Sequence, residues 1–330
     1  MIRKTGHPIS RRTFVGGALA GMSVMGLNAE VPKPPSGSIP MREFGKTGVK
    51  LTVIGQAGSR LALLRTREAA RVQVRHAYDL GINYFDCARA YWNGHSEEAY
   101  GDVLPEFRKD VFITTKSTQR TREGAEKDLA TSLAALKTDY IDLWQVHGVQ
   151  DHEDVEKIFA PGGAIEAFEA AKKAGKVRFI GFTGHHDPNT HVEMLKRYDK
   201  WDSILMPLHA ADPAYLSFEK ITLPHAIDQG IGIQAMKVFC NAFLLRVLSV
   251  DECLRYSLSL PVSCAALGCS SVGQLNDNVR IVQNFKPYTQ QEMADLANLA
   301  VTAGPGGLQG PALEYWKVGG LSFVNGVWGK

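Results

Sequence analysis

The sequence lacks the features that mark several classes of protein. Its five cysteines form no Cys-x-x-Cys pair in 330 residues, so neither a disulfide framework nor a zinc ribbon is expected. The 37 basic and 34 acidic side chains leave a net charge of +3 without a long basic run, which gives no support for nucleic-acid binding. No apolar run reaches the roughly 20 residues of a stable membrane span. The composition, 45% hydrophobic and 22% charged, is that of a globular protein.

The N-terminal segment has the layout of an export signal. Arg11 and Arg12 are followed by Phe14 and by a short, glycine-rich apolar run over residues 15–27. This pattern resembles the twin-arginine motif, whose translocation machinery exports proteins that are already folded. We therefore expect a twin-arginine signal over residues 1–29, a proline-rich spacer over 30–40 and a periplasmic location. If the arginine pair is fortuitous, the protein is cytoplasmic.

From residue 41 onward, short β-branched segments alternate with amphipathic segments of helical period. Strands are expected at 51–54, 82–86, 111–116, 140–147, 177–183, 202–207, 232–239 and 263–267. Helices are expected at 66–80, 96–107, 123–136, 163–174, 190–198, 214–229, 250–259 and 271–285. Regular alternation of strand and helix predicts a parallel α/β sheet. Eight such units predict a (β/α)8 TIM barrel.

This barrel is expected to form a single domain over residues 41–330. A turn at 42–48 indicates an N-terminal β-hairpin, and a C-terminal tail from about residue 288 lies either over the pocket or beneath the barrel. A doubly wound sheet would require the pattern Gly-x-Gly-x-x-Gly after its first strand. The segment at 55–58, Gly-Gln-Ala-Gly, lacks that spacing, and the barrel is therefore favoured.

Polar residues end three consecutive strands. Asp86 closes the second strand and is soon followed by Tyr91, Lys116 closes the third strand, and His147 closes the fourth. Because the chemistry of such barrels lies at the carboxyl ends of the strands, these side chains are expected at one mouth. A nearby ammonium is expected to lower the pKa of a tyrosine from its reference value of about 10, while a histidine orients a carbonyl group. The set predicts proton donation to an oxygen whose carbon receives a hydride, not a nucleophilic triad.

At these residues the chain resembles the aldo-keto reductase family. The resemblance rests on Asp86-x-Ala88-x-x-Tyr91, on Lys116 and His147, on the Gly-Lys-Thr-Gly turn at 45–48 and on the segment 268–278. It covers residues 41 to about 285 and implies an NAD(P)H-dependent reduction of a small-molecule aldehyde or ketone to an alcohol. On this resemblance Tyr91 is the general acid, Lys116 and Asp86 tune it, and His147 orients the carbonyl.

The resemblance also implies a dinucleotide site. Family residues that match Gly268, Ser270, Gln274 and Asn278 hold the adenosine phosphate end. Family habit favours NADP(H) over NAD(H), although no basic residue lies within 268–278. The residues expected to bind cofactor are Asp86, Thr183, Gly184, Met206, Met236, Lys237, Gly268, Ser270, Gln274 and Asn278.

The nicotinamide end departs from the usual family pattern. Thr183 and Gly184 replace a Ser-Asn pair, Met206 replaces a glutamine, and Met236 with Lys237 replaces the aromatic residue that stacks on the ring. Such segments are similar to those of a divergent, largely bacterial branch of the family. Methionine still presents polarizable apolar surface to a ring. We therefore expect a reshaped pocket.

Besides His147, two residues are candidates for the substrate pocket. Two other functions also stay open. Arg60 and Trp92 fit a place at the pocket, and they equally fit surface or loop packing. A metal-dependent barrel hydrolase would use the histidines at 95, 147, 185, 186 and 209, but the first strand has no His-x-His pair, so no metal site is predicted. A non-catalytic dinucleotide-binding sensor or partner protein would keep the fold and lose turnover.

Overall fold

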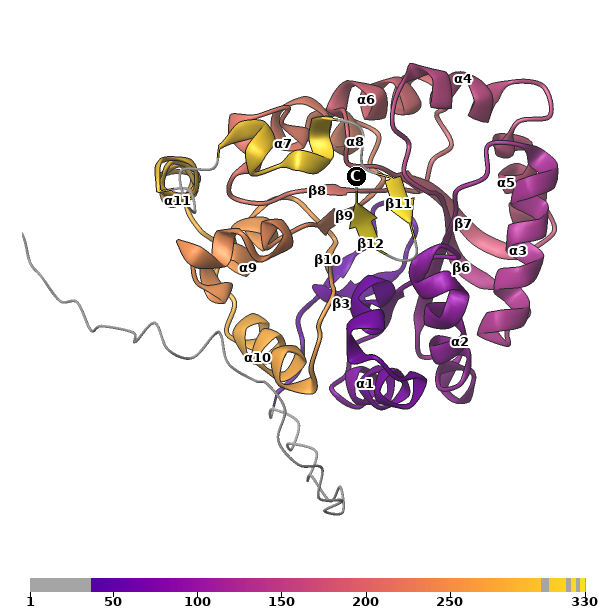
Figure 1. Cartoon of the computed structure of the whole chain (residues 1–330), viewed down its shortest axis with the longest axis horizontal. Helices are drawn as coiled ribbons and strands as arrows, with labels where there is room; N and C mark the ends of the chain where they lie inside the picture. Colours follow the sequence, from indigo (N-terminus) through magenta and orange to yellow (C-terminus); the bar gives the residue numbers. More distant parts are fainter. Residues whose placement is uncertain (1–36, 304–308, 319–321, 325–326, 330) are drawn as a thin grey trace, which may run out of the picture. The chain divides into compact units, whose positions relative to one another are not determined.

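The computed structural model describes residues 37–303, 309–318, 322–324 and 327–329; the expected export signal and most of the spacer lie outside these residues. Eight parallel strands close into a barrel, and Figure 1 shows helices packed around them. In barrel order these are β10 (Cys264–Leu267), β3 (Ile54–Ala57), β4 (Tyr84–Asp86), β5 (Phe112–Ser117), β6 (Ile141–Val146), β7 (Val177–Thr183), β8 (Ser203–Pro207) and β9 (Gly232–Met236). The predicted (β/α)8 TIM barrel is confirmed.

The helices follow the strands as expected, with differences at proline. They are α1 (Arg67–Asp79), α2 (His95–Gly101), α3 (Arg122–Leu136), α4 (His152–Phe159), α5 (Ala164–Lys173), α6 (Pro188–Arg197), α7 (Phe218–Ile221), α8 (Leu223–Asp228), α9 (Val250–Ser259), α10 (Val272–Gln283) and α11 (Gln290–Thr302). The single helix expected at 214–229 is wrong, because Pro224 has no N–H to continue a helix and separates α7 from α8. Ser249 and Thr289 form capping boxes that begin α9 and α11.

The first barrel strand is shifted from its expected position. Residues 50–52 form β2 (Lys50–Thr52), which pairs antiparallel with β1 (Met41–Glu43), and the barrel strand begins only at Ile54. Leu51 is apolar for a different reason: with Phe44 it packs on Tyr84 and Phe112 inside the barrel. Gly232, the first residue of β9, has no side chain where the ring of Phe44 lies. The predicted hairpin therefore closes the amino-terminal end of the barrel, and the carboxyl end is left for chemistry.

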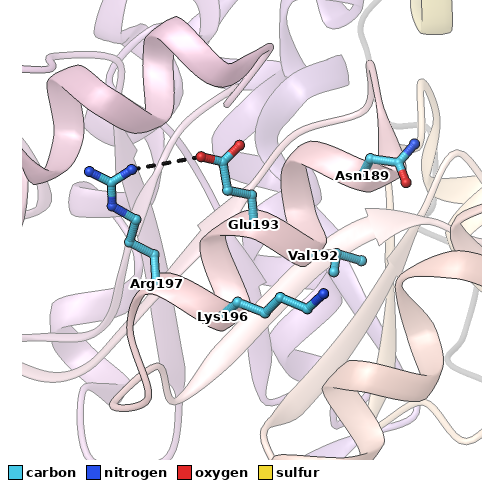
Figure 2. Close-up of a pocket in the computed structure, with 5 residues that line it drawn as sticks. All are labelled: Asn189, Val192, Glu193, Lys196 and Arg197. Atoms are coloured by element: carbon cyan, nitrogen blue, oxygen red, sulfur yellow. Dashed lines mark ion pairs between the residues drawn. The ribbon is translucent and has the colours of Figure 1, made fainter.

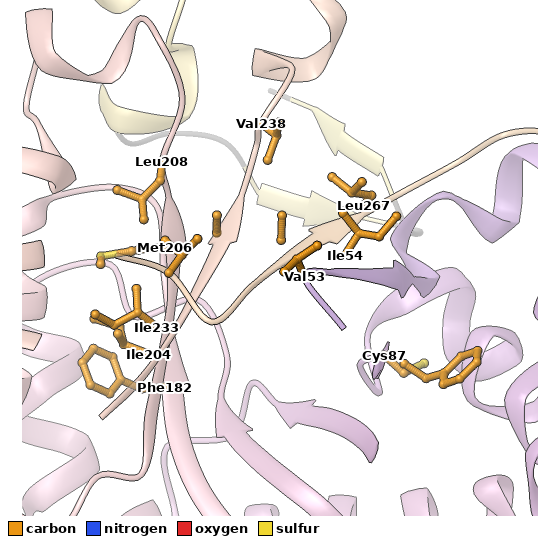
Figure 3. Packing of buried hydrophobic residues seen from close by; sticks show 14 of the residues in the cluster. Val53, Ile54, Cys87, Phe182, Ile204, Met206, Leu208, Ile233, Val238 and Leu267 are labelled. Atoms are coloured by element: carbon orange, nitrogen blue, oxygen red, sulfur yellow. The ribbon is translucent and has the colours of Figure 1, made fainter. Parts of the chain in front are cut away.

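Side chains alternate between the barrel interior and the layer under the helices, as the pleat of a strand requires. Phe182, Ile204, Met206 and Ile233 belong to the buried apolar cluster that includes the helices, and Figure 3 shows part of this packing. All five cysteines are buried and free, as the absence of paired motifs indicated. Among the described residues, no helix is both long and apolar enough to cross a membrane.

Candidate active site

The structure brings Asp86, Tyr91, Lys116 and His147 together at the carboxyl ends of neighbouring strands. Asp86 is the last residue of β4, Lys116 lies near the end of β5, and His147 directly follows β6. Tyr91 begins the 3-10 turn η2 (Tyr91–Gly94) after β4. The rings of Tyr91 and His147 meet edge to face with centroids 5.5 Å apart, and the Lys116 Nζ lies 5.0 Å from the Tyr91 centroid.

Asp86 and Lys116 form a buried ion pair. The Lys116 Nζ donates to Asp86 Oδ2 at 2.6 Å and to the backbone oxygen of Cys87 at 2.5 Å, and both side chains are almost fully buried. Burial raises the pKa of Asp86, and the Lys116 ammonium opposes that rise. The pair therefore holds the Lys116 ammonium on the Asp86 carboxylate, 5.0 Å from the centre of the Tyr91 ring.

Tyr91 is held in its protonated form. Burial raises its pKa well above the ordinary value, and the negative charge of Asp86 raises it further. This corrects the expectation of a lowered pKa for Tyr91: burial is the largest cause of the rise, and the Asp86 carboxylate adds to it. The Tyr91 hydroxyl therefore keeps its proton at neutral pH, and the side chain is half-buried at the mouth.

His147 is the neutral partner of this group. Burial lowers its pKa well below the ordinary value, and the positive charges of Lys116 and Arg120 lower it further. The Arg120 Nη2 also donates to the backbone oxygen of His147 at 3.0 Å, which fixes the residue after the strand. The His147 Nδ1 is buried without a hydrogen-bond partner in the described part of the chain. A neutral imidazole offers one donor and one acceptor, which suits a carbonyl substrate.

The loop that carries Tyr91 is strained and tightly held. Trp92 and Asn93 both adopt left-handed φ angles, 49° and 52°, and a Cβ at Gly94 would lie 1.3 Å from the Arg89 Nη2. Arg89 forms an ion pair with the buried Glu97. Such strain is characteristic of sites where the surroundings impose a conformation. Trp92 is half-buried, and its ring meets the His95 ring edge to face with centroids 5.5 Å apart. Its side chain thus packs within the loop that carries Tyr91.

Of the residues expected at the nicotinamide end of the cofactor, Thr183 and Met236 lie at strand ends, whereas Met206 does not face the barrel interior. Thr183 ends β7 on its inward-facing side, and Met236 ends β9 half-buried. Gly184 is close to its neighbours: a Cβ there would lie 2.3 Å from the Val149 carbonyl oxygen, which excludes the family's usual asparagine. The expectation for Met206 is wrong, because it is fully buried in the layer under the helices and Leu205 takes the inward position on β8.

A second group of predicted residues gathers where β3, β9 and β10 end. Gly268 leaves room for the stem of Arg60, since a Cβ there would lie 2.4 Å from the Arg60 Cγ. The Arg60 Nη2 and the Lys237 Nζ both donate to Asn241 Oδ1, at 3.2 and 3.3 Å. Burial and the charge of Arg60 lower the pKa of Lys237 to about 8. Arg60 therefore lies beside Gly268, one of the residues predicted to hold the adenosine phosphate end of the dinucleotide.

The remaining predicted residues order the start of α10. Ser271 is the N-cap, and the exposed Ser270 donates to Gln274 Oε1 through its backbone N–H at 2.9 Å and its hydroxyl at 3.2 Å. Asn278 is buried and donates to the Cys269 Sγ at 3.4 Å. These contacts explain Ser270, Gln274 and Asn278 as loop-shaping residues. They also set exposed backbone N–H groups at a helix start, where phosphates bind readily.

Within the described part of the C-terminal tail, Tyr315 and Trp316 pack against loops at the carboxyl end of the barrel, whereas α11 packs on α9 in the outer layer. The ring of His185, after β7, bonds to the backbone of Trp316, and the Lys237 Nζ lies 5.1 Å from the Trp316 ring centroid. The Asn241 Nδ2 donates to the Tyr315 hydroxyl at 2.7 Å. No local sequence pattern predicts these contacts, because they join residues more than 70 positions apart.

Among the described residues, two clusters with metal-ligand chemistry lie outside the candidate catalytic group. In the first, His209, Asp212 and Glu314 are buried together, but the Lys317 Nζ lies 2.7 Å from Asp212 and 2.6 Å from Glu314, so an ammonium already neutralises these carboxylates. The second, His152, Glu156 and Glu193, is largely exposed on the helical layer.

A surface hollow lies beside the second cluster, on α6. Asn189, Val192, Glu193, Lys196 and Arg197 line it, as Figure 2 shows. Every one of these residues comes from the same outer helix, and none of the predicted site residues contributes. The candidate catalytic group thus lies at the strand ends and outside this hollow.

The sequence model of the Aldo/keto reductase family matches residues 58–248, more than half of the chain. The chain therefore belongs to the aldo/keto reductase family, and the predicted enzyme class is confirmed at the level of the family. L-galactose dehydrogenase of Arabidopsis thaliana is 26% identical over 305 residues, which cover 75% of this chain and 89% of that protein. The oxidoreductase YqkF of Bacillus subtilis is 30% identical over 168 residues, 47% of this chain; the chain thus spans about half of the length of that relative, 52%.

Solved structures agree on the fold. Aldo-keto reductase AKR11C1 from Bacillus halodurans, in its holo form, superposes with a TM-score of 0.67 at 25% identity, covering 79% of this chain and 96% of that one. An aldo-keto reductase from Klebsiella pneumoniae, solved in complex with NADPH, gives a TM-score of 0.64 at 20% identity over 79% of this chain and 95% of that one.

Proposed function

We propose that this protein reduces an aldehyde or ketone to an alcohol with a nicotinamide dinucleotide, NADPH in preference to NADH. The observation that carries the proposal is the protonated Tyr91 beside a neutral His147 and the buried Asp86–Lys116 pair, all at one barrel mouth. The family assignment favours this reading over a metal-dependent hydrolase.

The residues divide the work of one proton transfer. When bound, a nicotinamide dinucleotide would supply the hydride that the carbonyl carbon accepts. The Tyr91 hydroxyl donates its proton to the carbonyl oxygen, where negative charge develops. The Lys116 ammonium, 5.0 Å from the Tyr91 ring, stabilises the phenolate that remains, and Asp86 holds that ammonium in place. The neutral His147 offers a hydrogen bond to the same oxygen and so orients the carbonyl.

The residues present fit a dinucleotide. At the phosphate end, Gly268 has no side chain, the start of α10 presents backbone N–H groups, and Arg60 and Lys237 add positive charge. At the nicotinamide end, Met236 offers a half-buried apolar surface and Thr183 a hydroxyl. Two observations support the preference for NADPH. Arg60 and Lys237 place two positive charges at the phosphate end, and the structurally similar Klebsiella pneumoniae enzyme was solved in complex with NADPH.

A titration with each dinucleotide tests the cofactor assignment. Tryptophan fluorescence of the purified protein is expected to change with micromolar dissociation constants, tighter for NADPH than for NADH because Arg60 and Lys237 attract the extra phosphate. Arg60→Ala is expected to weaken NADPH binding more than NADH binding. Loss of binding to both dinucleotides in the unmodified protein would contradict the proposal; tight binding without carbonyl reduction would establish the sensor alternative.

We also propose that the protein is exported through the twin-arginine pathway to the periplasm. The support is the sequence alone, Arg11 and Arg12 before a short apolar run. The double substitution Arg11→Lys and Arg12→Lys is expected to retain the protein in the cytoplasm, as measured by cell fractionation with a cytoplasmic marker. Unchanged periplasmic recovery of the double variant would show that the arginine pair is not read as a signal.

A further inference from the structure

We propose that Tyr84 is a positioning residue for the reduction: its hydroxyl, held by Gln234, holds the Asp86 carboxylate that anchors Lys116. The inference rests on the proposed function and extends the catalytic group by one layer into the barrel. Tyr84 and Gln234 are fully buried, and Tyr84 lies two residues before Asp86 on β4, deeper in the barrel. Tyr84 therefore acts through Asp86 and not on the substrate.

A continuous chain of hydrogen bonds runs from the Asp86–Lys116 ion pair into the barrel interior. The Tyr84 hydroxyl donates to Asp86 Oδ2 at 3.3 Å, the oxygen that also accepts from the Lys116 Nζ at 2.6 Å. The Gln234 Nε2 donates to the Tyr84 hydroxyl oxygen at 2.6 Å. The Gln145 Nε2 in turn donates to Gln234 Oε1 at 3.0 Å. Every donor in this chain points toward the carboxylate, so each bond polarises the next in the direction that stabilises its negative charge.

The barrel is shaped to admit the tyrosine. A Cβ at Gly55 on β3 would lie 2.1 Å from the Tyr84 Cδ1, so the ring occupies the space that any other residue at position 55 would fill. Phe112 packs on the other side, with ring centroids 6.1 Å apart. The interiors of such barrels are normally filled with branched apolar side chains. Here a buried tyrosine and two glutamines replace them, and Gln145 Oε1 has no hydrogen-bond partner in the described residues. Burial of these polar side chains costs free energy, and their hydrogen bonds hold the Asp86 carboxylate in place.

In the described part of the chain, two side chains donate hydrogen bonds to the Asp86 carboxylate: Lys116 and Tyr84. The titratable groups facing Asp86 or Tyr84 from the packed elements are Lys116, Tyr91, Cys87, Tyr100 and Cys264. A hydrogen bond to the charged form of a carboxyl favours ionisation. Without the Tyr84 hydroxyl, Asp86 would therefore take up a proton at a higher pH, and the anchor of Lys116 would be lost there.

Tyr84→Phe tests the inference against Tyr100→Phe as a matched control. Tyr100 is equally buried, but its hydroxyl donates to the backbone oxygens of Gln56 and Asp86, at 2.8 and 3.2 Å, and not to the carboxylate. For Tyr84→Phe we expect kcat to fall about 10-fold at neutral pH, with the dissociation constant for the dinucleotide unchanged. Its acid limb in kcat is expected to move up by about one pH unit, whereas that of Tyr100→Phe stays in place.

A readout independent of turnover separates this inference from the proposed function. Carbon-13 NMR of aspartate-labelled protein follows the Asp86 carboxyl directly, and its pKa is expected to rise in Tyr84→Phe but not in Tyr100→Phe. If the unmodified protein reduces no carbonyl compound, the proposed function fails while the NMR comparison still decides the role of Tyr84. Should Tyr84→Phe not fold, Gln234→Met is expected to give a smaller rise in the same direction. An Asp86 titration that is equal in the unmodified protein and the variants would overturn the inference.

Discussion

Replacement of Tyr91 by phenylalanine is expected to lower kcat for carbonyl reduction by about 10²–10⁴-fold. The substitution removes the proton that the developing alkoxide requires and leaves the ring in place, so the edge-to-face contact with His147 at 5.5 Å is kept. The Asp86–Lys116 pair does not depend on the hydroxyl and stays intact. Dinucleotide affinity, measured by tryptophan fluorescence, is therefore expected to change by no more than a few-fold.

The surface residue Tyr78 provides the control for this prediction. Its ring stacks on Phe107 on the outside of the barrel, with centroids 3.8 Å apart, so Tyr78→Phe removes a hydroxyl far from the strand ends and is expected to retain full activity. A Tyr91→Phe variant that kept more than a tenth of the unmodified turnover would remove Tyr91 from the mechanism. Because its pKa is raised, the unmodified enzyme is expected to keep the donor protonated throughout the neutral range.

Three of the four candidate catalytic residues could be predicted from the sequence because they lie within one residue of a strand end, and Tyr91 follows five residues after Asp86. Asp86, Lys116 and His147 stand after apolar β-branched runs on consecutive strands, and the barrel topology then makes them neighbours. The period of two along β4 also places Tyr84 on the same face as Asp86, so the deeper layer was within reach of the same reasoning.

Other features depend on three-dimensional detail that no local pattern contains. Met206 and Leu205 are both apolar, and only the register of β8 decides which one faces the interior. The pKa of Tyr91 is shifted in the opposite direction from the expectation, because burial of the phenol and the negative charge of Asp86 both raise it, and burial depends on the whole fold. Leu51 reads as a barrel strand from its hydrophobicity alone, yet it belongs to the hairpin that closes the barrel.

The C-terminal tail leads to the second large effect, at Lys317. This side chain is fully buried and its ammonium contacts Asp212 at 2.7 Å, Glu314 at 2.6 Å and the backbone oxygen of Tyr215 at 2.7 Å. Lys317→Met would leave two carboxylates buried without their cation. Removal of one partner from a buried ion pair costs about 3–5 kcal/mol, and we expect a loss of this size in the free energy that docks the tail.

Release of the tail would be seen first as local exposure. Tyr315 and Trp316 are half-buried and buried against the loops after β7 and β9, where chymotrypsin cannot reach them. In Lys317→Met, chymotrypsin is expected to cut at these residues many times faster than in the unmodified protein. The free energy of global unfolding in urea is expected to fall by less than the free energy that docks the tail. The barrel can lose no more stability than the docked tail contributes to it.

Lys157→Met is the matched control for the tail. Lys157 pairs with Glu153 at 2.7 Å on α4, but both side chains are more than half exposed, so water solvates the carboxylate when its partner is removed. Its proteolysis pattern and unfolding midpoint are expected to equal those of the unmodified protein. Because Trp316 contacts His185 and Lys237 at the mouth, release of the tail in Lys317→Met is also expected to change the Michaelis constant for the carbonyl substrate. If the cleavage rate of Lys317→Met matched that of Lys157→Met, the buried ion cluster would not be what holds the tail over the catalytic end.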